Sequence, residues 1–136
     1  RALRREHHAV RAAVHYNRAE WADAERTWRA VLGMAEGEGD VRASTEAALE
    51  LATVLRRRGR HRESRLFAKQ ALESSRRLHY REGVADALHC LSALAWSEAD
   101  LEECERMATE GLLIAQGSLL ADRRAELLLA LTAAQA

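Results

Sequence analysis

The sequence predicts an all-α protein built from repeated helix pairs, and three observations carry this prediction. Ala (28) and Leu (20), which favour helices, make up more than a third of the 136 residues, and no Pro interrupts them. The β-branched residues that favour strands are few, with six Val, one Ile and five Thr. When the sequence is compared with itself, similar residues recur at an offset of 40.

The offset of 40 residues places small side chains at fixed points of three successive repeats, and no gap is needed to align them. The aligned positions are Ala12, Ala52 and Ser92; Ala19, Gly59 and Ala99; Ala24, Ser64 and Cys104; Val31, Ala71 and Gly111; and Leu32, Leu72 and Leu112. Small residues at the same place in each repeat indicate that helices approach one another closely there.

Each repeat is predicted to form two helices, because its apolar residues are spaced by three and four. Asp40 after a Gly-rich stretch indicates an N-cap, Gly59 divides the second repeat, and Gly117 precedes a further helix. The expected helices are residues 2–18, 20–36, 40–58, 60–78, 81–98, 100–116 and 119–134. They form three pairs, in repeats 1–39, 40–79 and 80–117, and a terminal helix within 118–136.

Composition limits the class of protein. The length suits one domain, residues 1–136, and the 21 basic and 21 acidic side chains cancel, so no overall charge attracts nucleic acid or an anionic membrane. No stretch reaches the roughly 18 apolar residues of a membrane-spanning helix. Cys90 and Cys104 are too few for a disulfide framework and are expected to be packed thiols of a cytoplasmic protein. Because residue 1 is Arg rather than Met, we expect a piece of a longer chain.

The start of the second helix follows one pattern in all three repeats, at residues 19–24, 59–64 and 99–104: a small residue, then an acid and another small residue. This pattern resembles the signature of the tetratricopeptide repeat (TPR). The standard TPR has 34 residues, and the longer repeat here is similar to those of bacterial regulators of the MalT and antibiotic-regulatory type and of kinesin light chains. The resemblance implies a right-handed α-solenoid whose first helices line a concave groove for a protein or peptide.

The resemblance also implies which side chains line that groove. The family's positions fall on Tyr16, Glu46, Leu49, Thr53, Arg56, Asp86, His89 and Trp96. One row is acidic throughout (Glu6, Glu46, Asp86 and Glu126), and it either receives a basic group of a partner or offsets the helix dipole. Trp96 is either an anchor for a bound peptide or a core residue, whereas Trp21 and Trp28 are expected in the core. The Lys and Asn set of chaperone-binding TPR domains is missing, although Arg56 and Arg57 could hold an isolated acid.

Residues 56–62 contain five Arg and one His, a composition that is also found in nucleic-acid-binding segments. The offset of 40 favours ion pairs between repeats instead. Arg58, Arg60, Arg62 and Arg65 align with Glu98, Asp100, Glu102 and Glu105, and Glu20 and Glu25 align with Arg60 and Arg65. Neighbouring helices lie about 8 to 10 Å apart, a distance that Arg and Glu side chains span. We therefore expect a ladder of ion pairs and no bound nucleic acid.

The sequence predicts no enzyme, metal site or cofactor. No two His side chains have the four-residue spacing of a helical metal site, and there is no Gly-rich phosphate loop. Cys104 aligns with Ala24 and Ser64, which is typical of a small packing residue.

The terminal helix has more apolar residues than one buried stripe requires. Either a further repeat covers it in a longer chain, or it packs on another copy. We expect self-association through Leu127, Leu129 and Leu131. Two functions thus stay open: a groove that binds a protein or peptide, by resemblance as the sensor of a bacterial regulator, and a structural segment that forms homo-oligomers.

Overall fold

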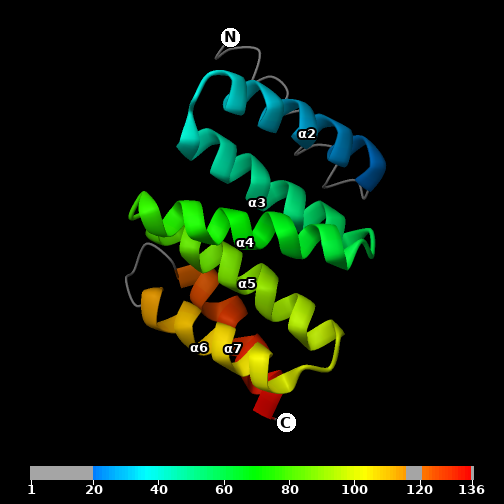
Figure 1. The fold of residues 1–136 in the computed structure, drawn as a ribbon. Coiled ribbons are helices and arrows are strands. Elements are labelled where there is room, and N and C mark those ends of the chain that lie inside the picture. The colour runs from blue at the N-terminus through cyan, green and yellow to red at the C-terminus, as the bar shows by residue number, and fades with distance from the viewer. Residues whose placement is uncertain (1–19, 116–120, 136) are drawn as a thin grey trace. The chain divides into compact units, whose positions relative to one another are not determined.

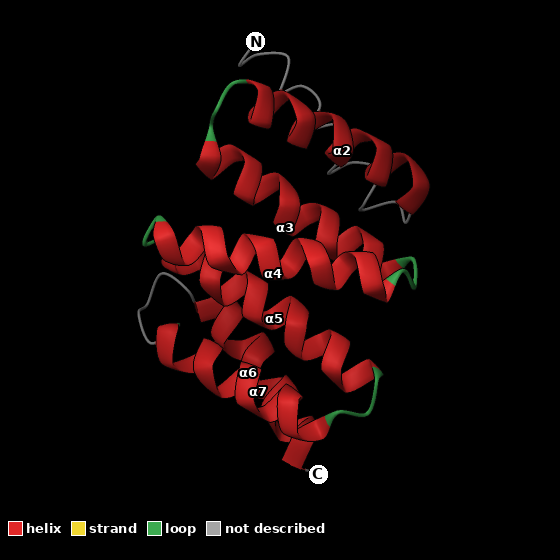
Figure 2. Cartoon of the chain, in the orientation of Figure 1, coloured by secondary structure: helices red, strands yellow, loops and turns green. Residues whose placement is uncertain are grey.

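The computed structural model describes residues 20–115 and 121–135, and these residues are helical apart from short turns (Figure 1, Figure 2). The helices are α2 (Trp21–Gly37), α3 (Val41–Arg57), α4 (His61–Arg77), α5 (Arg81–Ser97), α6 (Leu101–Ile114) and α7 (Ala121–Gln135). The all-α class is confirmed, and the helices expected from residue 20 onward are found with ends within two residues of the prediction. The expected helix 2–18 lies outside the described residues.

Consecutive helices from α2 to α6 are joined by turns of three residues. The middle residue of each turn has a left-handed backbone, with φ of 69° at Gly39, 78° at Gly59, 53° at His79 and 59° at Ala99. The next residue donates its amide hydrogen to a carbonyl five residues earlier, as Asp40 does to Ala35 over 3.0 Å, which is the hydrogen bond of a Schellman motif. The carbonyl of Asp40 then accepts the first hydrogen bond of α3, from Ser44 over 2.9 Å. A new helix therefore begins every 20 residues.

The chain falls into two compact units, residues 1–70 (unit 1) and 71–136 (unit 2), with the boundary inside α4. In unit 1, α2 packs against α3. In unit 2, α6 packs against both α5 and α7, and α5 also contacts α7 (Figure 1). The expectation of one domain over residues 1–136 stays a prediction.

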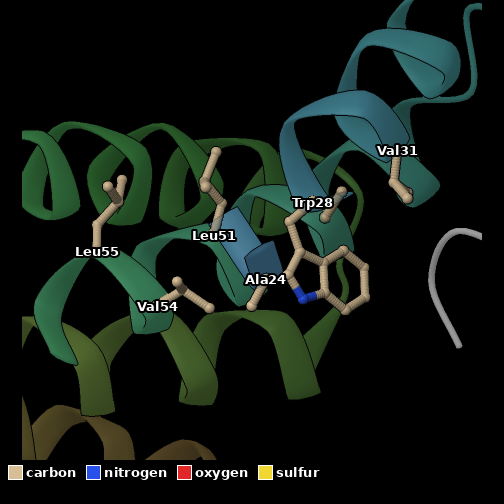
Figure 3. Packing of buried hydrophobic residues seen from close by; sticks show 7 residues of the cluster. Ala24, Trp28, Val31, Leu51, Val54 and Leu55 are labelled. Carbon is tan, nitrogen blue, oxygen red and sulfur yellow. The ribbon is translucent and has the colours of Figure 1, made fainter. Parts of the chain in front are cut away.

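The core of unit 1 joins α2 to α3. Figure 3 shows its main side chains, which are Ala24, Trp28 and Val31 from α2 and Leu51, Val54 and Leu55 from α3. Trp28 is 9% exposed, and Trp21 packs against the same cluster, so both are in the core as predicted. Where α4 meets α3, the fully buried Ser64 donates a hydrogen bond to the carbonyl of Ala52 over 2.6 Å. The aligned small residues therefore mark a close helix contact, as the repeat predicted.

The core of unit 2 depends on a glycine. A Cβ atom at Gly111 on α6 would lie 2.8 Å from Cδ1 of Leu127, so the missing side chain leaves the space that Leu127 of α7 occupies. Leu127 is fully buried as a result, in a cluster with Ala108 and Ala115.

A buried carboxylate joins α2 to the turn between α3 and α4. Glu25 is only 7% exposed, and one of its oxygens accepts hydrogen bonds from Arg58 over 2.7 Å and from Arg60 over 3.0 Å. Its other oxygen accepts one from Arg29 over 2.9 Å. Arg29 also reaches Glu63 of α4 over 2.9 Å. Burial raises the pKa of the Glu25 carboxyl, but the hydrogen bond from Arg29 and the charges of the arginines outweigh burial and lower that pKa below 4.5.

We predict that Glu25→Gln lowers the free energy of unfolding by about 2 kcal/mol near pH 7, because the arginines lose a charged acceptor. A carboxyl whose pKa is lowered by folding stabilises the protein above its unfolded pKa, and this contribution is lost as the pH falls through the folded value. The difference between the wild type and Glu25→Gln should therefore shrink below a pH of about 4. Urea unfolding measured across that range checks this.

Glu46→Gln is the matched control. Glu46 is 52% exposed and pairs with Arg42 four residues away, so its change should stay under about 0.5 kcal/mol. A difference between the wild type and Glu25→Gln that does not change from neutral to acid pH would contradict the role of the Glu25 charge.

Candidate functional site

Four of the expected groove residues lie along α3 in unit 1, spaced by three or four residues so that they share one face of the helix. Glu46 is exposed, Leu49 is 7% exposed, and Thr53 is partly buried and donates its hydroxyl hydrogen to the carbonyl of Leu49 over 3.1 Å. Arg56 is partly buried in the last turn. Tyr16 lies outside the described residues. The α3 row therefore offers hydrogen-bonding and charged groups beside one apolar side chain that is already packed.

Three more lie along α5 in unit 2, at the positions 40 residues further on. Asp86 and His89 are partly buried. Nε2 of His89 lies 3.2 Å from a carboxylate oxygen of Glu126, which joins α5 to α7. Trp96, in the last turn of α5, is 48% exposed. Trp96 is therefore not a core residue in unit 2, and its role as an anchor for a peptide stays a prediction.

The acidic row does not offset helix dipoles. Glu46, Asp86 and Glu126 are each the sixth residue of their helix, beyond the first turn in which the dipole acts on a side chain. Glu46 pairs with Arg42 on its own helix, and Glu126 pairs with His89. Glu6 lies outside the described residues. Glu46 is thus held by an ion pair on its own helix and Glu126 by a contact with His89 of α5, and the role of the acids toward a partner stays a prediction.

Ion pairs between helices are present in both units, but those of Arg58, Arg60 and Arg76 do not follow the alignment, because they join residues 33 to 35 apart rather than 40. The offset of 40 matched Arg60 with Glu20, whereas the structure pairs Arg60 with Glu25. The reason is geometric, because Glu25 lies one turn further along α2, on the side that faces the turn between α3 and α4. In unit 2, Arg76 of α4 pairs with Glu110 of α6.

The leucines of α7 differ in exposure. Leu127 is fully buried and Leu131 is partly buried against the same cluster, whereas Leu129 is 72% exposed. Leu128 beside it is 47% exposed. Of the three residues expected to mediate self-association, the structure places Leu129 on the surface and Leu127 in the core.

Both cysteines are buried free thiols, as predicted. Burial, together with the charge of Asp100, raises the pKa of the Cys104 thiol, which favours the less reactive protonated form. In the part of the chain that the structure describes, no three His, Cys, Asp or Glu side chains are grouped so that they could hold a metal ion. None of the described helices is long and apolar enough to span a membrane.

Two polar contacts were not foreseen. The contact between His89 and Glu126 joins residues that had been assigned to different rows, and only the packing of α7 on α5 brings them together. Glu25 was placed opposite Arg65, and its burial gives no repeat signal because positions 25, 65 and 105 carry Glu, Arg and Glu. Its one local signal is Arg29, four residues later on the same helix.

Comparisons with known proteins identify the fold. Neither the protein-family models nor the curated proteins gave a match to this sequence. Among solved structures 15 chains match. One is the crystal structure of BtubC (BKLC) from P. vanneervenii, a bacterial TPR protein like kinesin light chains, with a TM-score of 0.78 and 18% sequence identity. The match covers 94% of this chain and 55% of that one, so the chain spans about half the length of this relative. The chain has a TPR-like fold of paired α-helices.

Proposed function

We propose that this chain is a protein- or peptide-binding module, without catalytic activity, that uses the exposed residues of α3 and α5. The TPR-like fold supports protein interaction in general terms, since helical repeats present extended binding surfaces. The resemblance of the repeats assigns α3 and α5 to the first helices, which line the groove. We further propose that the longer protein is a cytoplasmic bacterial regulator and that this module senses its partner.

The observation that carries the proposal is the exposure of Trp96. Trp28 and Trp21 pack in the core of unit 1, but 48% of Trp96 remains exposed. Covering the exposed part of a large apolar side chain is favourable, and Trp is enriched among the residues that dominate binding energy. Trp96 ends a row that also contains Asp86 and His89, and its equivalent on α3 is Arg56. An apolar anchor beside polar and charged groups fits a peptide with an apolar side chain and polar neighbours.

We predict that peptides selected by the chain from a random displayed library lose affinity about 30-fold for Trp96→Ala and about tenfold for Arg56→Ala, as anchors of an interface do. Fluorescence anisotropy with a labelled selected peptide measures this, and circular dichroism checks that each variant stays folded.

Leu66→Ala serves as the control, since Leu66 is 58% exposed but lies on α4, a second helix. Loss of binding in Leu66→Ala equal to that in Trp96→Ala, or peptides that bind Trp96→Ala as tightly as the wild type, would refute the use of the α5 row.

Self-association through α7 is the second candidate function, and the exposure of Leu129 favours it. Adjacent Leu128 adds to this apolar surface. Leu127, which fills the space beside Gly111, would act on the stability of unit 2 rather than on association.

For this candidate we expect sedimentation equilibrium to show dimers of the wild type and monomers of the double variant Leu128→Ser and Leu129→Ser. Leu113→Ser is the control, since Leu113 is 62% exposed on α6 and its loss should leave the dimers intact. A wild type that stays monomeric at high concentration would exclude self-association.

A further inference from the structure

The five arginines at residues 56, 57, 58, 60 and 62 form one surface, which we call the arginine corner. They occupy the last turn of α3, the three-residue turn and the first turn of α4, all within unit 1. Two of them are fixed by the buried carboxylate of Glu25, as described above, and Arg60 also pairs with Glu63. These ion pairs therefore hold Arg58 and Arg60 in a defined conformation.

Arg29, Arg58 and Arg60 share two carboxylates, Glu25 and Glu63. Arg58 also lines a pocket with Glu20 and Asp23, so the positive charge that the corner adds comes from its other arginines. The side chains of Arg58 and Arg60 also remain 33% and 43% exposed. Their outward faces keep N–H donors available for a further carboxylate, because a guanidinium has five donors.

The remaining three arginines of the corner have no ion pair with any residue that the structure describes. Arg57 and Arg62 are exposed, whereas Nε of Arg56 is buried and finds no acceptor among the described residues. Because Arg56 Nε is buried, the donors that a docked carboxylate can reach are those of Arg57 and Arg62. The corner thus combines positive charge with exposed hydrogen-bond donors.

Helix stability does not account for the whole cluster. Arg56 and Arg57 lie in the last turn of α3, where a positive charge is favourable. Arg60 and Arg62 lie at the start of α4, where the helix dipole disfavours a positive charge. Glu25 compensates Arg60, but Arg62 has no such compensation among the described residues. Arg62 therefore does not stabilise α4, and this makes it a candidate for binding a partner.

We infer that the arginine corner is a docking surface for a short acidic segment of a protein partner, whose Asp and Glu carboxylates accept paired hydrogen bonds from the guanidinium groups. This inference rests on the proposed function, since Arg56 belongs to both surfaces, and it adds the chemistry of the partner. The carboxylates of Glu46, Glu50 and Glu63 lie on the same two helices and would repel a long polyanion. A short acidic peptide therefore fits the corner better than a nucleic acid does.

The test uses the full chain and three labelled probes: a peptide of about eight residues in which Asp and Glu alternate with Gly and Ser, the same peptide with Lys for each acid, and a single-stranded DNA of the same number of charges. We expect the acidic peptide to bind, the Lys peptide not to bind, and the affinity to fall when salt is raised from about 0.05 M to about 0.3 M. The double variant Arg57→Glu and Arg62→Glu should bind the acidic peptide at least about tenfold more weakly.

The double variant Arg26→Glu and Lys69→Glu is the matched control. It changes the net charge by the same amount at exposed residues of unit 1 outside the corner, and it should keep the affinity of the wild type. Equal losses in the two double variants, no binding of the acidic peptide, or tighter binding of DNA that requires Arg57 and Arg62, would each overturn the inference. Library peptides that need Trp96 but neither Arg57 nor Arg62 would overturn the arginine corner alone and leave the proposed function standing.

Discussion

The three-residue turn that follows each of α2, α3, α4 and α5 is the constraint on which the rest of the structure depends. One residue in each turn takes a left-handed backbone, which lets the chain reverse after each helix of 17 residues. The following residue closes one helix and opens the next. Seventeen helical residues and three turn residues make 20, so two helices make the repeat of 40. The standard 34-residue TPR is thus lengthened by about three residues in each helix.

This regular spacing decides what each position of a helix can do. Residues 40 apart have the same place in their helices, so buried positions take small residues, as at Ser64 and Cys104, and exposed positions are free to differ. The last turn of α3 carries Arg56 where α5 carries Trp96. The two proposed binding surfaces follow from this difference, since one is lined by the exposed Arg57 and Arg62 and the other offers the exposed ring of Trp96.

Periodicity predicted the helices well because the length and the buried face of a helix both depend on residues that are close together in sequence. The repeat alignment also predicted that Cys104 is a packed residue. The partner of Arg60 was misplaced because an ion pair depends on how far side chains reach, which alignment at a fixed offset does not record. The leucines of α7 could not be sorted either, because residues 127 to 131 are all apolar, so the sequence does not show which side of the helix is buried. The space beside Gly111 places Leu127 on the buried side, and Leu129 then lies on the exposed side. The partner itself leaves no local pattern in the sequence.

The most direct test of the turn as the central constraint is the stability of Ala99→Gly beside that of Gly59→Ala. Both residues have a positive φ, and a Cβ atom at Gly59 would meet nothing within 4 Å, so the backbone alone sets the effect there. The account predicts that Ala99→Gly raises the free energy of unfolding by about 0.5 to 1 kcal/mol and that Gly59→Ala lowers it by about 1 kcal/mol. If Ala99→Gly instead lowers stability, as glycine does within an ordinary helix, the left-handed turn is not what sets the spacing of the helices.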